Sequence, residues 1–383
     1  MSLKVHSKLP ALPESIFTTV SMLARKHNAI NLGQGFPDFP MDESLQDLVF
    51  RAMRNGHNQY AHSNGNPELR EVLAAKMQSL HGYRPDPDTE ITITPGGTYA
   101  ISNAITSILQ KGDEVIVFEP CFDSYLPNIR MMGAIPVCIQ MQHPAYLIPW
   151  DTVREKITSR TRMILINSPH NPSGSILRPE DLQQLNEIVS GSNILVMSDE
   201  VYEHLVFDGH QHESILRYPE LYARSFVAFS LGKVLHCTGW KIGYCVAPPF
   251  LMKEFRNHHQ FNVFSVSSAL QQGIAEYLQN PEVYLSLPSF FQRKRDLFLE
   301  AIKGSIFRPL QTEGSYFQCV EFQEDAGMSD REYAENLIVN SGVASVPLSA
   351  FYADGRDLRV LRFCFAKKDE TLRDAGERLQ RLR

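Results

Sequence analysis

The sequence lacks the features that mark several large classes of protein. Its six cysteines show neither a C-x-x-C spacing nor a paired pattern, which argues against a zinc site and against a disulfide framework. No run rich in lysine or arginine appears, and 37 basic against 43 acidic residues give a formal charge of -6. We therefore expect no metal site and no nucleic-acid partner.

Long apolar runs and internal repeats are also absent. No stretch approaches the ~20 apolar residues of a membrane span, and the first residues contain no apolar signal core. Secretion and membrane insertion are unsupported, so we expect a cytoplasmic protein whose cysteines are reduced and lie in its core.

The chain is long enough, at 383 residues of which 43% are hydrophobic, to bury a large core and a second, smaller one. Short apolar runs alternate with helical patterns over the first two thirds of the sequence. These runs are Ile91–Thr94, Val115–Phe118, Ile135–Ile139, Met163–Ile166, Ile194–Met197, Phe226–Phe229 and Ile242–Val246. Apolar strands separated by helices predict an α/β fold with a mostly parallel seven-stranded sheet that helices cover on both faces.

The pattern changes toward the C-terminus. Helices are predicted at about Val266–Leu278, Glu282–Ala301 and Asp330–Asn340, and strands at Tyr316–Val320 and Leu358–Phe365. We expect a large domain over residues 32–280 and a small α+β domain over residues 281–383. The segment 1–31 is expected to pack with the small domain, with a second subunit as the alternative.

Two glycines lie between a predicted strand and a predicted helix. The sequence Thr94-Pro-Gly-Gly-Thr98 leaves the strand at 91–94 and enters a helix, whose first N–H groups are free to bind an anion. A plain turn is the alternative for so short a motif.

Two other strands also end in polar residues: Asp199 follows the run 194–197, and Asn171 follows the run 163–166. Each could instead serve as a helix cap or a turn residue.

Two lysines follow another strand. Lys233 comes just after the run Phe226–Phe229, and Lys241 follows eight residues later. Either could be a solvated surface lysine. A lysine desolvated beside another cation, however, has a lowered pKa and can condense with a carbonyl compound.

The carboxyl ends of these strands meet at one edge of the sheet. An anion site, a carboxylate, an amide and a lysine at one edge together meet the needs of pyridoxal 5'-phosphate. The joint occurrence of the four elements favours that cofactor, although each element alone is weak evidence.

These residues, in this order, are typical of a known family. The sequence resembles the class I/II aminotransferases of pyridoxal-phosphate fold type I, within them the kynurenine, glutamine and methionine aminotransferase subgroup. The resemblance extends from the motif NLGQGFPDF at 31–39 to LRFCFAKK at 361–368. It implies a homodimer with shared active sites and a ping-pong Schiff-base mechanism.

The resemblance also implies roles for individual residues. Lys233 would bind the cofactor covalently and then carry a proton, while Asp199 would keep the ring nitrogen protonated. The remaining expected contacts to the cofactor are Asn171 and Tyr202 at the phenolic oxygen, Gly97, Thr98, Ser230 and Lys241 at the phosphate, Phe122 on the ring face, and Tyr60 reaching the neighbouring subunit's phosphate. Core packing is the alternative for Phe122. Many aminotransferases have arginine at the position of Lys241, and the kynurenine-type subgroup shares this lysine.

Substrate contacts follow from the same resemblance. Arg362 would bind the substrate α-carboxylate through a bidentate pair, with a structural ion pair as the alternative. Gly35 and Asn171 would contact the same end of the substrate. Phe17 and Phe264 occupy positions of the side-chain pocket, and their apolar character favours aromatic or sulfur-containing amino acids over dicarboxylates.

The sequence thus predicts an aminotransferase that moves the amino group of methionine, glutamine, phenylalanine, tyrosine or kynurenine to a 2-oxo acid. Three alternatives stay open: a cysteine-conjugate β-lyase, an aspartate aminotransferase, and a non-catalytic regulatory module that binds the cofactor. A Rossmann oxidoreductase is set aside because the glycines do not form G-x-G-x-x-G.

Overall fold

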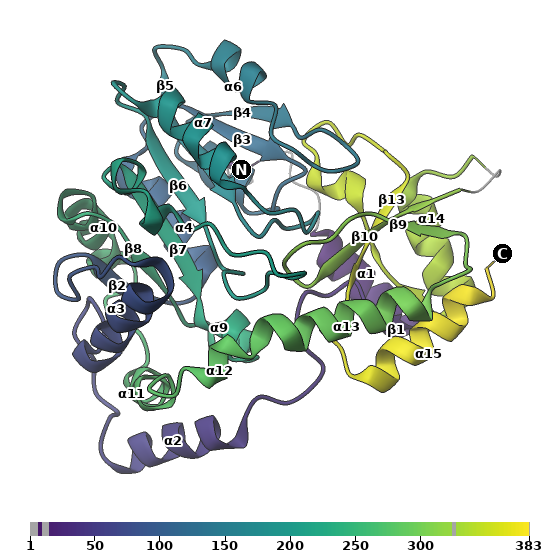
Figure 1. Ribbon diagram of the computed structural model, residues 1–383, viewed down its shortest axis with the longest axis horizontal. Helices are drawn as coiled ribbons and strands as arrows, with labels where there is room; N and C mark the ends of the chain where they lie inside the picture. Colours follow the sequence, from purple (N-terminus) through teal and green to yellow (C-terminus); the bar gives the residue numbers. More distant parts are fainter. Residues whose placement is uncertain (1–6, 10–14, 324–326, 383) are drawn as a thin grey trace, which may run out of the picture.

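The computed structural model describes residues 7–9, 15–323 and 327–382. This part of the chain contains a seven-stranded sheet, a four-stranded sheet and a two-stranded pair. Figure 1 shows the large sheet and its helices on one side of the molecule and the four-stranded sheet on the other. The long helix α13 (Leu287–Ala301) runs from the first group of elements to the second (Figure 1).

The large sheet has the strand order β2-β8-β7-β6-β5-β3-β4. Its strands are β2 (Ile91–Thr94), β3 (Glu114–Glu119), β4 (Ile135–Gln140), β5 (Thr161–Asn167), β6 (Leu195–Asp199), β7 (Ser225–Ser230) and β8 (Gly243–Val246). All seven predicted strands are confirmed to within two residues at each end. The prediction of a mostly parallel sheet is also confirmed, since only β8 runs antiparallel to its neighbours.

The reversal at β8 has a simple cause in the chain. Parallel neighbours need a crossover of a dozen or more residues, usually a full helix. The connection between β7 and β8, residues 231–242, is at the lower limit of that length and forms only the short helices α9 (Leu231–Val234) and η2 (Thr238–Trp240) instead of a full helix. The connection therefore stays at the sheet edge where β7 ends, and it holds both Lys233 and Lys241 there.

Alternate residues of the strands enter two separate cores. Ile116 and Phe118 of β3 belong to one core, whereas Val115 and Val117 belong to the other. The second core includes α4 (Gly97–Ile108), α5 (Tyr125–Met131) and α10 (Pro249–Asn262). The first includes α2 (Glu43–Arg54), α3 (Pro67–His81), α6 (Trp150–Lys156), α7 (Pro179–Val189), α8 (Pro219–Tyr222) and α11 (Ser268–Tyr277). Both faces of the sheet are thus covered, as its continuous apolar runs predict.

Helix α3 shows how the local sequence determines where a helix begins and ends. Asn66 caps its first turn by accepting hydrogen bonds from the backbone N–H groups of Glu68 and Leu69, and Pro67 occupies the first helical position. The helix ends at Gly82, whose φ of 75° is left-handed. Leu69, Leu73 and Met77, which share one face of the helix, are fully buried.

The four-stranded sheet is antiparallel and has the order β12-β13-β10-β9. Its strands are β9 (Phe307–Pro309), β10 (Phe317–Phe322), β12 (Val346–Pro347) and β13 (Val360–Cys364). Packed with it are α1 (Ile16–Lys26), α13, α14 (Asp330–Asn336) and α15 (Asp369–Gln380). Strand β1 (Ile30–Asn31) pairs in parallel with β11 (Val343–Ala344), which joins the N-terminal segment to this half of the chain. The domain boundaries at residues 31 and 280 stay a prediction.

Two predicted helices in this half differ from the structure. The helix expected over 282–301 is divided into α12 (Glu282–Leu285) and α13, because Pro288 lacks the N–H that a continuous helix would need there. The helix expected to reach Asn340 ends as α-helix at Asn336 and continues as a π-turn over Leu337–Ser341, called η3.

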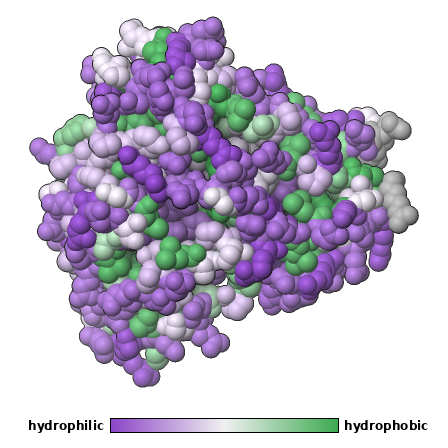
Figure 2. Space-filling model, viewed as in Figure 1, coloured by the Kyte–Doolittle hydropathy of each residue, from purple (hydrophilic) through white to green (hydrophobic). Residues whose placement is uncertain are grey.

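The surface agrees with the balanced composition. Figure 2 shows a mainly hydrophilic face on which apolar side chains form small scattered groups. Among the described residues, no helix is both long enough and apolar enough to cross a membrane. Five of the six cysteines are buried, as expected for core residues, and Cys138 is partly buried.

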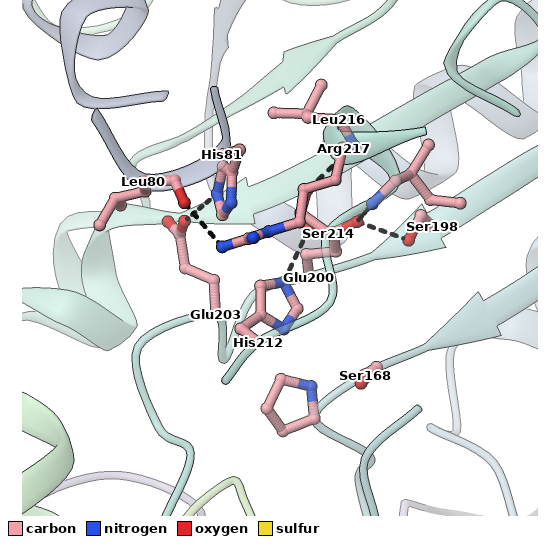
Figure 3. Close-up of polar contacts among 12 residues, drawn as sticks. Leu80, His81, Ser168, Ser198, Glu200, Glu203, His212, Ser214, Leu216 and Arg217 are labelled. Atoms are coloured by element: carbon pink, nitrogen blue, oxygen red, sulfur yellow. Dashed lines mark hydrogen bonds and ion pairs between the residues drawn. The ribbon is translucent and has the colours of Figure 1, made fainter. Parts of the chain in front are cut away.

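A buried polar cluster supports the turn that follows β6. Glu203 accepts a hydrogen bond from Lys76 of α3 at 2.5 Å, and both side chains are almost fully buried. Figure 3 shows Glu203 beside His81 and Glu200 beside His212, whose Nε2 lies 2.8 Å from the carboxylate. Burial alone would raise the pKa of Glu203, but Lys76 and the adjacent histidines hold it well below its usual value.

Replacing Lys76 by methionine is expected to destabilise the protein. The substitution leaves Glu203 buried without its cation, which typically costs about 3–5 kcal/mol. A shift of the urea unfolding midpoint would measure the effect. The matched control is Lys111→Met, at an exposed lysine, for which we expect a change within about 0.5 kcal/mol. Equal midpoints for the two variants would show that the buried ion pair does not stabilise the fold.

Candidate functional site

A pocket of about 130 Å³ lies at the carboxyl edge of the large sheet. It is lined by Gly96, Gly97, Thr98, Ile101, Phe122, Asn171, Asp199, Val201, Tyr202, Ser230, Gly232, Lys233, Thr238, Lys241 and Ile242. Nine of the ten residues that the sequence predicts for cofactor binding are in this lining, and Tyr60 is the exception. Five separate segments of the chain therefore converge at this edge, as the strand topology predicts.

Lys233 lies in α9, directly after β7, and its side chain is partly buried. Its Nζ donates to the hydroxyl of Tyr316 at 2.6 Å and to the carbonyl of Gly35 at 3.2 Å. Burial, followed by the positive charges of Lys241 and Arg362, lowers the pKa of Lys233 to about 8. A larger fraction of this side chain is therefore the neutral, nucleophilic amine near neutral pH.

Asp199 is the last residue of β6 and is buried. Tyr125 donates a hydrogen bond to its Oδ2 at 2.5 Å, and the N–H of Val201 donates to Oδ1 at 3.2 Å. Burial raises the pKa of Asp199 to about 6, although these two hydrogen bonds oppose the shift. A cationic ligand group beside this carboxylate would offset part of the free-energy cost of burying the charged form of Asp199.

Asn171 and Tyr202 line the same pocket as Asp199. The backbone N–H of Asn171 donates to the side chain of Asn167, whose amide donates in turn to the carbonyl of Asp199. Burial raises the pKa of Tyr202, so its hydroxyl is neutral and can donate a hydrogen bond. An amide and a phenol thus lie beside Asp199, where they could contact a ring oxygen.

The glycine turn provides a cradle at the start of α4. A Cβ at Gly97 would lie 2.6 Å from Val201 Cγ1, and one at Gly96 would lie 3.3 Å from Lys241 Nζ. Gly96 also has a φ of 87°, which favours glycine. Free N–H groups, the hydroxyls of Thr98 and Ser230 and one ammonium group thus surround the same space. This donor set fits a phosphate monoester.

Arg362 lies on β13 and is buried with only 1% exposure. Its guanidinium donates to Asn171 Oδ1 at 2.7 Å and to the carbonyl of Gly33 at 3.1 Å, while its Nε has no hydrogen-bond partner among the described residues. Within the described part of the chain no carboxylate forms an ion pair with it. Asp123 interacts with this arginine electrostatically without forming an ion pair. Because a buried charge without a carboxylate in direct contact is costly, the arrangement favours an anionic ligand over the structural ion pair that was the alternative.

Three aromatic rings surround this guanidinium. The ring centroids of Phe317, Phe351 and Phe17 lie 3.8, 4.9 and 5.3 Å from Arg362 Cζ. Phe17 thus lies beside the arginine, and its role in the substrate pocket stays a prediction. Gly35 is close as well, but its described contacts are to Lys233 and Tyr316 through its carbonyl.

Tyr60 and Phe264 lie apart from this pocket in the single chain. Their rings meet edge to face at 5.1 Å on the surface, where Tyr60 is 82% exposed and Phe264 is 47% exposed. The nearby chain also exposes Phe261. The structure therefore does not bring these two predicted residues to Lys233 of their own chain.

Sequence reasoning missed several residues that the fold brings to the site. Tyr125 belongs to the motif that contains Phe122, but nothing in the sequence links it to Asp199. Tyr316, Phe317 and Phe351 come from the C-terminal half and contact Lys233 or Arg362. They resemble ordinary core aromatics, so the sequence carries no signal for them beyond the position of Tyr316 at the start of a predicted strand.

Comparison with known proteins agrees with this arrangement. The family model described as aminotransferase class I and II matches residues 27–379. The methionine aminotransferase of Escherichia coli (strain K12) is 43% identical over 378 residues, covering 98% of each chain. The kynurenine–oxoglutarate transaminase of Dictyostelium discoideum is 32% identical over 409 residues, covering 96% of this chain and 94% of the relative.

A solved structure shows the same fold. The crystal structure of an Escherichia coli protein with a methionine aminotransferase function has a TM-score of 0.96 and 42% identity, with both chains fully covered. The match extends over the pocket at the sheet edge and over the half of the chain that holds Arg362. The chain belongs to the class I and II aminotransferases, and its cofactor is pyridoxal 5'-phosphate.

Proposed function

We propose that this aminotransferase takes the amino group from an aromatic or sulfur-containing amino acid and passes it to a 2-oxo acid. The observation that carries the proposal is that one backbone segment holds both reactive cations. The carbonyl of Gly33 accepts from Arg362, and the carbonyl of Gly35 accepts from Lys233. A substrate carboxylate at Arg362 would therefore place its α-amino end toward the lysine.

Nine residues of the pocket lining have a task in this proposal. When bound, pyridoxal phosphate supplies an aldehyde that takes up the amino group and a ring that withdraws electrons from the substrate Cα. Asp199 holds a proton on the ring nitrogen, and Asn171 and Tyr202 donate to the ring oxygen. Lys233 moves a proton to and from the substrate Cα. Phe122 packs on the ring face, and the phosphate contacts come from Gly97, Thr98, Ser230 and Lys241.

The surroundings of Arg362 support the proposed substrate class. The three phenylalanine rings around its guanidinium exclude water and offer apolar contacts to a side chain. The similarity to methionine and kynurenine aminotransferases supports the same class. Glutamine stays among the proposed donors because its side chain carries no charge.

A second copy of the chain is part of the proposal. Tyr60 is 82% exposed and contacts Phe264 edge to face at the surface, which suits a tyrosine that reaches the phosphate of a neighbouring subunit. Phe264 would then line the neighbour's substrate pocket. A homodimer with shared active sites and a cytoplasmic location both stay predictions.

The first test is a set of half-reactions. The purified protein with added pyridoxal phosphate is given single amino acids without any oxo acid, and its absorbance is followed. We expect the aldehyde band to convert to the pyridoxamine phosphate band, fastest with methionine or an aromatic amino acid. Faster conversion with aspartate would contradict the substrate class. Release of pyruvate from cysteine conjugates without conversion of the aldehyde band would favour a β-lyase. An absorbance band that responds to no amino acid would favour a binding module.

Removing the amine at Lys233 is expected to abolish the reaction. Lys233→Ala should lose the absorbance band of the covalently bound cofactor and about 10³-fold or more in turnover, because both nucleophile and proton carrier are gone. The matched control is Lys241→Ala in the same connection, which should keep the band but bind the cofactor more weakly. Turnover at the wild-type rate in Lys233→Ala would refute the role of this residue.

The role of Arg362 in substrate binding can be tested by measuring the KM for amino acids separately from the affinity for the cofactor. Arg362→Ala should raise the KM for amino acids about 100-fold, since losing a bidentate charged contact costs roughly 3 kcal/mol. Arg362→Lys keeps the charge without the planar fork, so its KM for amino acids should lie between those of the wild type and of Arg362→Ala. The dissociation constant of pyridoxamine phosphate should stay within about twofold. An unchanged KM would make the arginine a structural residue.

A further inference from the structure

Lys367 is a buried lysine that follows the strand of Arg362. It lies three residues beyond the end of β13 and is only 3% exposed. Its Nζ donates to the carbonyl of Phe36 at 2.8 Å and to that of Gln34 at 3.4 Å, and no carboxylate of the described residues forms an ion pair with it. An apolar side chain would fill this place at a smaller desolvation cost, so the charge indicates a role beyond packing.

The carbonyls of the segment 33–36 alternate between two sets of cations. Those of residues 33 and 35 accept hydrogen bonds from Arg362 and Lys233, the two cations of the site. Those of residues 34 and 36 accept from Lys367. Lys367 therefore holds the segment through carbonyls that the two cations of the site do not use.

One peptide unit of this segment joins Gln34 to Gly35. Its carbonyl accepts from the N–H of Phe36 at 3.0 Å and from Lys367 at 3.4 Å. In a planar trans peptide the carbonyl and the following N–H point in opposite directions, so the N–H of Gly35 points away from Lys367. Among the described residues this N–H has no hydrogen-bond partner, which leaves it available to a ligand.

Other groups hold only the first part of the segment. Asn31 Oδ1 accepts from the N–H groups of Gly33 and Gln34 at 3.0 and 3.2 Å, and the side chain of Gln34 donates to a backbone carbonyl of α1 at 3.1 Å. None of these contacts reaches the carbonyl of Phe36, which accepts from Lys367. Lys367 thus extends the support of the segment past Gly35.

We propose that Lys367 is a positioning residue for substrate binding: it holds the carbonyls on both sides of Gly35 and so presents the N–H of Gly35 to the α-carboxylate that Arg362 binds. The inference rests on the proposed function, in which Arg362 takes that carboxylate. The carbonyl of Gly33, two residues earlier, accepts from Arg362 at 3.1 Å, so the N–H of Gly35 lies near the guanidinium.

The test compares two adjacent lysines. Lys367→Met removes the buried ammonium group, whereas Lys368→Met is the matched control at an exposed lysine. We expect Lys367→Met to raise the KM for methionine about tenfold, as for the loss of one hydrogen bond to a charged group, with kcat within about threefold. Lys368→Met should keep the wild-type KM. Equal KM values in the two variants would overturn the proposal.

A second readout separates positioning from general damage to the site. The compound 3-phenylpropanoate has a carboxylate and an aromatic ring but no amino group, so its competitive inhibition constant reports on the carboxylate site. This constant should also rise about tenfold in Lys367→Met, while the dissociation constant of pyridoxamine phosphate stays within about twofold. Equal losses of both affinities would make Lys367 a merely structural residue and overturn the proposal.

A second variant covers a failure of Lys367→Met to fold. Lys367→Gln removes the charge but keeps an amide group on a shorter side chain. We expect its inhibition constant for 3-phenylpropanoate to rise about threefold or more, since the contacts to the two carbonyls are weakened. A wild-type inhibition constant in this variant would overturn the proposal.

Failure of the proposed function would look different. If Arg362→Ala binds 3-phenylpropanoate as tightly as the wild type does, the carboxylate site itself is wrong, and the role of Lys367 is overturned with it. If the affinity for 3-phenylpropanoate depends on Arg362 but not on Lys367, only the positioning role is overturned, and the proposed function stands.

Discussion

The short connection between β7 and β8 is the constraint on which the rest of the site depends. Residues 231–242 form only two short helices and no crossover helix, and the chain turns back beside the strand it has just left. This reversal keeps Lys233 and Lys241 at the edge where β5 and β6 end. It also sets Ser230, Gly243 and Thr94 side by side across the sheet, which places the glycine turn next to both lysines.

Desolvation shapes the chemistry of the groups collected at that edge. Burial moves the pKa values of Lys233 and Asp199 toward neutrality from opposite sides. Arg362 stays charged in an apolar setting of aromatic rings, and its pKa is lowered by the same burial. The site therefore presents a reactive amine, a receptive carboxylate and an unpaired guanidinium, each at an energetic cost that a ligand with matching charges would offset.

Local sequence patterns predict a large part of this arrangement. Apolar runs locate the strands, and the carboxyl edge of a parallel sheet then brings Gly97, Asn171, Asp199 and Lys233 together without further information. The contact between Lys233 and Tyr316 is different, because it depends on how the four-stranded sheet docks onto the large one. No periodicity encodes that docking. Tyr60 and Phe264 depend on a second chain, which a single sequence does not describe.

The segment from Gly33 to Gly35 has a consequence for protein engineering. Its first and last carbonyls accept hydrogen bonds from Arg362 and Lys233, and the Phe317 ring leaves no space beside Gly35. Insertions or larger side chains in this segment would disturb substrate affinity and cofactor attachment together. Libraries aimed at a new amino-acid preference are better directed at Phe17 on α1 and Phe351 of η4 (Leu348–Phe351), which approach the guanidinium without contacting the amine.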